Sequence, residues 1–479
     1  MSFSSLEIGK RALMAQSIGL DVTSNNIANV NTPGYARRQV LLKETDPRKI
    51  NEGFLGTGVI ADTIQSYREE FFDREIRKSD AQQASYNEDE KVFQSIQSAM
   101  GEPSDSGLNE IVSNFFNAFQ QVSLNPEDVA TRNNLLSSAQ TMVDKFHSTA
   151  QQLTDIRQGV SKDLYTDADT ANQLISDIAG LNKQISTSIT QSGDAANTYI
   201  DQREQKLEDL SKLAGVSVTQ GDSGMVNVYV NGINMITGSS FAKLKVDENV
   251  DAVTQERTLQ LSRVDPTTNT ETVLSPQAGE MMSLMKHYNT TLDDKDSSNS
   301  FSLFTQLNDF ANAIVTKVNG ISAGGYGLDD AGPNPPGRRI FEPYPNPATA
   351  STIEISGDVL DKPRDIPIAS AAGQPGDNSI ALQIANIATD TTFLNGSTPS
   401  DSFTQLLGKV GQMSQDATNG KSANQLVMDQ LTNQRDSVTG VNLDEEAVNL
   451  IKFQKAFEAS SRVVNTTNEI LTTIVNLGK

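Results

Sequence analysis

The carboxyl-terminal stretch decides how this chain folds. Residues 443–477 read LDEEAVNLIKFQKAFEASSRVVNTTNEILTTIVNL, and no proline or glycine interrupts residues 441–477. Apolar and small residues spaced alternately three and four apart form one seam, which predicts a coiled-coil helix. The acidic residues 444–446 favour the amino-terminal end of that helix. The seam consists of Leu450, Phe453, Phe457, Ser460, Val464, Thr467, Leu471 and Ile474.

A second apolar stripe begins near the amino terminus. Its members recur every seven residues, which predicts an amphipathic helix with one apolar face. We expect the helix to end before Pro33, because the residue preceding a proline is pushed out of helical geometry. Pro33 and Gly34 then favour a type II turn, which needs a positive φ at its third position. The stripe consists of Leu6, Leu13, Leu20 and Ile27.

Neither helix carries enough apolar surface to order itself. The free energy gained by burying one seam is smaller than the conformational entropy cost of ordering residues 441–477. The matching seven-residue stripe lies at the opposite end of the chain. We therefore expect the two termini to pair with each other and with neighbouring subunits, and to be poorly ordered in the free monomer. Periodicity alone leaves open a core helix inside one globular domain.

The sequence between the termini alternates between helical and strand patterns. Apolar residues follow helical spacing almost throughout residues 66–210, and again over 276–319 and 402–438. Between the first two, Val226, Val228 and Val230 alternate up to Asn231-Gly232, and alternation resumes after it, which predicts a β-hairpin. Nine of the sixteen prolines lie between Pro333 and Pro375, which favours short strands and loops there.

These patterns are nested, so we expect an α+β multidomain fold shaped as a stalk with a head. Both chain ends form a terminal α-helical coiled coil, the next layer is a helical bundle, and a β-rich head is inserted into it. The expected boundaries are 1–45 plus 441–479 for the coiled-coil polymerisation domain, 46–210 plus 276–330 plus 378–440 for the helical bundle, and 211–275 plus 331–377 for the β-rich outer domain.

The composition excludes several kinds of chemistry. The 479-residue chain has no cysteine, which excludes disulfides, thiol nucleophiles and cysteine-ligated metals. Neither His147 nor His287 has a second ligand at metal-binding spacing, and the glycine cluster at 324–327 lacks the P-loop pattern. Acidic pairs such as Glu69-Glu70 are expected by chance among 60 acidic residues. We therefore expect no catalytic residue, no metal, no cofactor and no enzymatic activity.

Charge and hydropathy narrow the choice of partners. The net charge of −22 argues against nucleic-acid binding. Residues 1–50 carry seven basic and four acidic side chains, and residues 443–479 carry four and five, so the acidity lies in the middle. Nearly neutral ends suit burial against a partner, although acidic solubility explains the pattern equally well. No apolar run reaches the roughly 18–20 residues of a membrane span, and the start lacks a secretory signal's apolar centre, so we expect no membrane contact and no cleavable signal.

Two segments resemble a known superfamily. Residues 24–39 read SNNIANVNTPGYARRQ, which resembles the amino-terminal signature of flagellar rod, hook and hook-associated proteins. This match is specific because amide side chains, a Pro-Gly corner and an aromatic residue follow a seven-spaced helix in that order. Residues 441–454, VNLDEEAVNLIKFQ, resemble the matching carboxyl-terminal signature.

The middle of the chain resembles one branch of that superfamily, the hook-filament junction proteins, or first hook-associated proteins. Three groups of residues carry this resemblance, and together they extend it over nearly the whole chain, the proline-rich loop at 332–347 excepted. They are Gly107-Leu108 with Phe115-Phe116, Asn125-Pro126 and Arg132; residues 307–315 with Val318-Asn319; and Gly376-Asp377-Asn378.

The resemblance implies a structural subunit of the bacterial flagellum. It implies export through the flagellar type III channel to the cell exterior, then self-assembly as a layer between hook and filament. The implied partners are copies of the chain, the hook protein, the next hook-associated protein and an export chaperone at the carboxyl-terminal helix. The expected subunit interface comprises Leu6, Leu13, Leu20, Asn25, Asn26, Ile27, Asn29, Pro33, Gly34, Tyr35, Leu450, Phe453, Phe457, Val464, Leu471 and Ile474.

Three alternatives remain open from the sequence. A hook or distal rod protein shares the terminal signatures but lacks the long helical region at 66–210. A secreted adhesin or type III translocator with helical ends belongs to a different class. A secreted enzyme, such as a peptidoglycan hydrolase on a rod-like scaffold, is disfavoured by the missing nucleophile, metal and histidine patterns.

Overall fold

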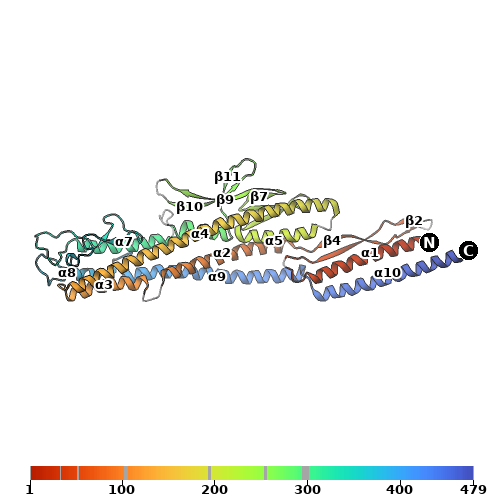
Figure 1. Ribbon diagram of the computed structural model, residues 1–479. Coiled ribbons are helices and arrows are strands. Elements are labelled where there is room, and N and C mark those ends of the chain that lie inside the picture. The colour runs from red at the N-terminus through yellow and green to blue at the C-terminus, as the bar shows by residue number, and fades with distance from the viewer. Residues whose placement is uncertain are drawn as a thin grey trace.

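The molecule is a long rod with both chain ends at one tip, as Figure 1 shows. The computed structural model describes residues 2–32, 34–50, 53–101, 106–192, 196–252, 256–293 and 301–477. The fold is α+β and multidomain, with long helices at both termini and β-sheets inserted between helical segments. The helices are α1 (Ser2–Ala28), α2 (Glu70–Met100), α3 (Leu108–Leu124), α4 (Val129–Ser192), α5 (Ala196–Ala214), α6 (Glu280–Lys286), α7 (Leu303–Ser322), α8 (Ser379–Ala385), α9 (Pro399–Thr439) and α10 (Leu443–Leu477).

One end of the rod, which we call the terminal unit, comprises residues 2–66 and 443–477. In it α1 packs against α10 and against two strands, β1 (Arg38–Glu44) and β4 (Val59–Ser66). β1 and β4 pair antiparallel with a bulge between Leu41 and Leu42, and the short β2 (Arg48–Ile50) and β3 (Gly53–Leu55) form the hairpin between them. The segment 46–66 therefore belongs with the termini, whereas the sequence analysis assigned it to the bundle.

The remaining residues, 67–439, form the body of the rod. α2 packs along α9, and the 64-residue α4 packs against α3 and α5. α9 begins at Pro399, whose fixed φ suits a first helical turn, after Thr398 accepts a hydrogen bond from the Asp401 amide. These helices confirm the helical spacing predicted for 66–210 and 402–438.

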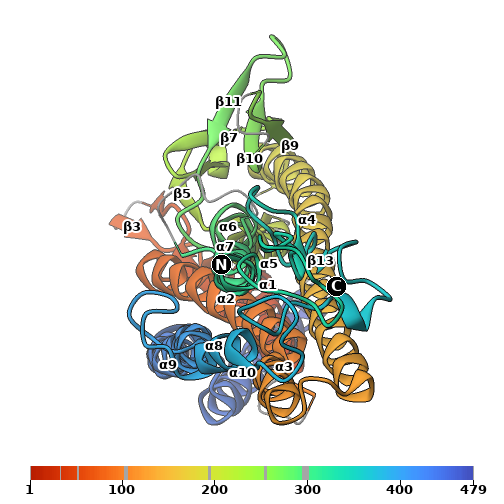
Figure 2. The same cartoon turned by 90° about the vertical axis from the view of Figure 1, so that its left-hand side faces the viewer.

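Two antiparallel sheets project from one side of the body, as the end-on view in Figure 2 shows. The predicted hairpin is confirmed: β6 and β7 are joined by Asn231 and Gly232 at φ 45° and 77°, the positive values that a tight hairpin turn needs. The four-stranded sheet has the order β5-β6-β7-β8 and the three-stranded sheet β11-β10-β9. The strands are β5 (Val216–Gln220), β6 (Val226–Val230), β7 (Ile233–Thr237), β8 (Ser240–Phe241), β9 (Lys243–Val250), β10 (Arg257–Val264) and β11 (Glu271–Leu274).

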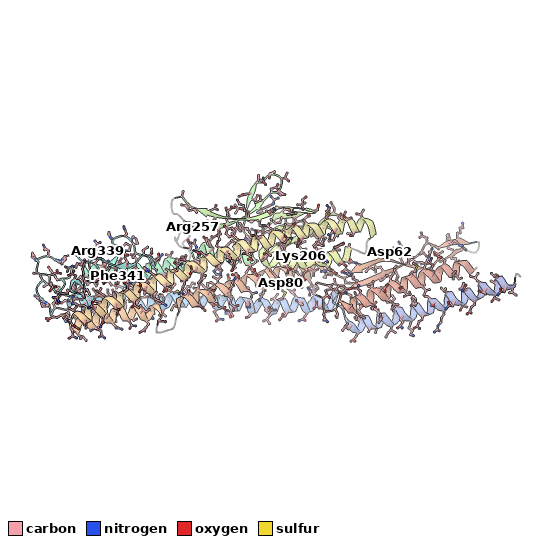
Figure 3. All side chains as sticks on the ribbon, viewed as in Figure 1. Asp62, Asp80, Lys206, Arg257, Arg339 and Phe341 are labelled. Carbon is pink, nitrogen blue, oxygen red and sulfur yellow. The ribbon has the colours of Figure 1, made fainter. Side chains whose placement is uncertain are left out.

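The proline-rich segment lies at the other end of the rod from the termini. Among the described residues it contributes only the two-residue strands β12 (Phe341–Glu342) and β13 (Glu354–Ile355), of which β12 packs against α7 and β13 against α4. Figure 3 labels Arg339 and Phe341 at this end, and Arg257 of the three-stranded sheet further along the rod. The expectation that 211–275 and 331–377 form one outer domain is therefore wrong in this structure, because each β segment packs on a different part of the helices.

One large apolar core runs through the body. Phe115, Phe116 and Phe119 of α3 are almost fully buried, and the Phe115 ring contacts Phe341 at 5.5 Å between centroids. Phe310 of α7 contacts the rings of Phe146 and Phe403. The core thus joins the proline-rich end to the helices.

Candidate assembly interface

The two terminal helices pack closely because glycine lies at their contact. A β-carbon added to Gly9 would lie 2.6 Å from Val464 Cγ2, and one added to Gly19 would lie 2.6 Å from Phe453 Cδ1. Both distances are too short for real carbon contacts, so only glycine allows this approach. The order of the contacts shows that α1 and α10 run antiparallel. The predicted pairing of the two chain ends is thus present within one chain.

The predicted apolar interface residues divide into two groups. Most are partly buried, and Phe453 and Val464 lie directly against α1. Phe457 and Ile474 remain 38% and 56% exposed. The partly buried members are Leu6, Leu13, Leu20, Ile27, Leu450, Phe453, Val464 and Leu471.

Asn26 joins three segments of the terminal unit. Its side chain is 1% exposed. Its Nδ2 donates to Glu446 Oε2 at 3.0 Å and to the Arg38 carbonyl at 2.8 Å. Its Oδ1 accepts from the Tyr35 hydroxyl at 2.8 Å and from the Arg38 amide at 3.0 Å. All the hydrogen-bonding capacity of this amide is used within the chain, so Asn26 presents nothing to a neighbouring subunit in this conformation.

The other predicted amides and the corner have local roles. Asn29 Nδ2 donates to the carbonyl of Asn25 at 2.9 Å and to its Oδ1 at 2.7 Å. Gly34 has φ 75°, and the Tyr35 amide donates to the Thr32 carbonyl at 3.2 Å, as expected for the predicted turn. Pro33 lies outside the described residues.

Arginines following this corner hold the terminal unit together and attach it to the body. Arg37 Nε lies 2.8 Å from the buried Glu446, and its Nη1 lies 3.0 Å from Glu445. Arg38 Nη2 lies 2.8 Å from Asp201 on α5. Burial raises the pKa of Tyr35, and the adjacent Arg38 opposes that rise. The acidic residues predicted only to favour the start of α10 therefore also bind arginine.

A second apolar stripe lies on α10, and the sequence pattern did not predict it. Val463 and Ile470 each precede a seam residue by one position, which places them about 100° around the helix from the seam. Both are 51% exposed, and Leu477 is 82% exposed. The apolar residues in 443–477 outnumber those that one seam uses, and this excess was the available signal. The stripe consists of Val463, Ile470 and Leu477, which are spaced seven residues apart, and Val448 and Ile451 are exposed apolar residues nearer the start of the helix.

The strands of the terminal unit also expose apolar side chains. Phe54 in β3 is 73% exposed, and its neighbour Leu55 and Ile60 in β4 are exposed as well. Together with α10 they give this end of the rod a concentration of uncovered apolar surface, which is typical of a protein interaction site.

The two histidines have structural surroundings. His287 is fully buried, with Nε2 2.8 Å from Asp89 Oδ1, while His147 Nε2 lies 2.7 Å from the Ile353 carbonyl. Among the described residues, no cluster of three or more His, Cys, Asp or Glu side chains is placed to hold a metal ion. Within the same part of the chain, no helix has the length and hydropathy to cross a membrane.

Comparisons with known proteins identify what this rod is. Residues 93–341, more than half of the chain, match the model of the flagellar hook-associated protein FlgK helical domain. The chain belongs to the FlgK family. Its ends match broader models, the flagella basal body rod protein at 6–35 and the carboxyl-terminal region of the basal body rod FlgEFG proteins at 433–477. The FlgK match in the middle therefore decides against the hook and rod alternatives.

Relatives of the FlgK family match along nearly the full length. The chain is 26% identical to flagellar hook-associated protein 1 of Bacillus subtilis (strain 168), over 99% of this chain and 98% of the relative. It is 22% identical to the Escherichia coli (strain K12) protein of that name, over 97% and 98%. The solved flagellar hook junction protein FlgK of Burkholderia pseudomallei has the same fold, with a TM-score of 0.63 and 15% identity over 76% of this chain and 100% of that one. As a member of the FlgK family, the chain is a structural, hook-associated component of the flagellum, which assembles with other flagellar components.

Proposed function

We propose that this chain self-assembles through its terminal unit into the layer that joins the flagellar hook to the filament, and that it has no enzymatic activity. The observation that carries the proposal is the stripe on α10 around Val463 and Ile470, which stays exposed although α10 already packs against α1. A helix with two apolar faces buries one within its chain and offers the other to a second chain.

Repetition of one such contact builds a tube segment. A head-to-tail contact that does not close on itself generates an open helical stack, so one subunit type suffices for a layer. The hook protein then lies on one side of the layer and the next hook-associated protein on the other. The name of the Burkholderia relative, a hook junction protein, supports this position.

The same stripe requires protection before assembly. Exposed apolar surface promotes aggregation, so an export chaperone that covers α10 accounts for a chain that travels through the flagellar type III channel to the cell exterior. The absence of cysteine suits passage from a reducing to an oxidising compartment.

The test is a double substitution on the exposed stripe, Val463→Asp with Ile470→Asp, in the bacterium that encodes the chain. We expect no filament growth from the variant, because two carboxylates cannot be buried unpaired between subunits. Val273→Asp on β11, at a side chain that is also about half exposed, is the matched control and should leave filaments intact.

Two outcomes would contradict the proposal. One is normal filaments on cells that carry the double variant. The other is assembly at the hook tip by a chain lacking residues 1–35 and 443–479. Circular dichroism of the purified double variant checks that the body remains folded.

A further inference from the structure

The apolar core of the body does not extend into the terminal unit. Among the described residues, the continuous buried cluster begins at Val92 and ends at Ala417, and it contains no residue of 2–66 or 443–477. The helices of the terminal unit bury their apolar residues against each other and against β1 and β4 instead. The two parts of the rod are therefore separate packing units.

The chain crosses between these units at two short segments. Residues 440–442 separate α9 from α10, and Gly440 lies where a β-carbon would clash with the Asp436 carbonyl. The Asn442 side chain accepts a hydrogen bond from the Asp444 amide at 2.9 Å and so caps the start of α10. The second crossing is at residues 67–69, between β4 and α2. Figure 1 shows the break between α9 and α10 midway along the rod.

The hydrogen bonds and ion pairs between the units gather on the first turns of α5. The Asp201 carboxylate forms ion pairs with Nη2 of Arg38 in β1, at 2.8 Å, and with Nη2 of Arg68 in the second crossing, at 2.7 Å. Arg68 also donates to the Gly34 carbonyl at 2.8 Å. Asn197 Nδ2 donates to the Ile64 carbonyl of β4 at 2.8 Å. One carboxylate thus connects two arginines across the joint.

At this joint the side chains leave a cavity, and two buried nitrogen atoms lack hydrogen-bond partners. A cavity of about 480 Å³ lies beside it, lined by Asn25, Tyr35 and Arg38 of the terminal unit and by Asp201 and Gln205 of α5. Within the described part of the chain, the buried Nε atoms of Arg38 and Arg68 have no hydrogen-bond partner. Such groups favour an opened arrangement in which water reaches them.

We propose that this joint is a hinge and that Asp201, bound to Arg38 and Arg68, is the latch that holds it. A small interface between two separately packed units permits relative motion, and salt weakens charge pairs to the extent that ions reach them, which the open cavity beside Asp201 allows. The angle between the terminal unit and the body is then a property that ionic contacts set. This hinge is independent of which surface binds the next subunit.

The test uses the absence of cysteine in the natural chain. Spin labels at Asn465→Cys on α10 and Gln152→Cys on α4, both exposed, report the distance between the units by pulsed electron resonance. We expect Asp201→Asn to broaden and shift the distance distribution at low salt. Asp163→Asn, which removes a carboxylate from the exposed ion pair with Lys91, is the control and should leave it unchanged.

A salt titration of the labelled chain with Asp201 intact needs no joint substitution, so it remains decisive if Asp201→Asn fails to fold. We expect 1 M sodium chloride to broaden the distribution of that chain toward the one that Asp201→Asn shows at low salt. A single narrow distribution, the same with and without Asp201 and at both salt concentrations, would overturn the hinge.

Discussion

Asn26 Nδ2 lies 3.0 Å from Glu446 Oε2, which links two residues separated by 420 positions in the chain. Replacing Asn26 by alanine leaves the buried Glu446 carboxylate, the Tyr35 hydroxyl and the Arg38 amide each short of a partner. A buried polar group without a partner costs about 1–3 kcal/mol. We therefore expect Asn26→Ala to accelerate hydrogen exchange throughout α1 and the start of α10. Asn25→Ala, at an exposed side chain, should leave exchange unchanged, and equal rates in both variants would refute this role.

Gly19 packs against the Phe453 ring too closely for any larger residue. We expect Gly19→Ala to weaken the pairing of α1 with α10, because overpacking typically costs about 1–3 kcal/mol. The matched control is Gly159→Ala in α4, where an added β-carbon meets nothing within 4 Å. That change should stabilise its helix by up to about 1 kcal/mol. Hydrogen exchange of α10 measures the first effect and urea unfolding of the body the second. Stabilisation by both substitutions would show that the two helices do not need glycine here.

Asp167 on α4 makes the stability of the body depend on pH. Burial, together with the neighbouring charges of Glu280 and Glu88, raises the pKa of this carboxyl to about 7. The unfolded pKa is about 3.9, so the folded chain holds the proton more tightly. This group therefore contributes most stability below about pH 4, and the contribution is lost as pH rises through 7.

The corresponding substitution is Asp167→Asn, which removes the charge and keeps the size. At pH 8 we expect the free energy of unfolding to rise by about 1 kcal/mol, a figure reduced for the partial exposure of the site. The gain should shrink at pH 5, as urea unfolding at both values will show. Asp169→Asn, at an exposed position on the same helix, serves as the control. A gain that is equal at both pH values would exclude titration of Asp167 as the cause.

Asn319 of α7 holds the proline-rich end of the rod. Its buried side chain donates to the Phe341 carbonyl at 2.8 Å and accepts from the Ile340 and Phe341 amides at 3.0 and 3.1 Å. We expect Asn319→Ala to expose residues 338–356 to hydrogen exchange, with a cost of about 1–3 kcal/mol for the unpaired amides. Asn312→Ala removes one bond, to the Ala348 amide, and should have a smaller effect. The reverse order would contradict the assignment.

Sequence patterns predicted the elements whose signals are local. The helices and the hairpin at Asn231-Gly232 follow from periodicity and turn chemistry that lie within a few residues of each other. The position of residues 331–377 did not follow, because two-residue strands carry no pattern that names a distant partner. The same limit explains Gly9 and Gly19, whose importance depends on Val464 and Phe453 more than 400 positions away.

The predicted assembly residues show where such reasoning stops. The apolar seam on α10 was visible because its spacing is regular, but a seam does not say whether its partner is in the same chain. In this structure α1 covers most of it, and the exposed Val463 and Ile470 lie outside it on another face of α10. Asn26 was predicted to lie in the subunit interface, and in this structure its side chain is buried and bonds to residues of its own chain.

The pairing of the first helix with the last has a consequence for the order in which the molecule forms. Closing a loop of some 400 flexible residues is entropically expensive, whereas contacts within the body are shorter in sequence. Folding of the body packs α2 along α9 and so brings residues 67 and 439 close together, which lets both chain ends leave the body at the same joint. The body of the rod therefore folds before the tip that carries both chain ends. The exposed apolar stripe on α10 becomes a defined surface only after α10 has packed against α1.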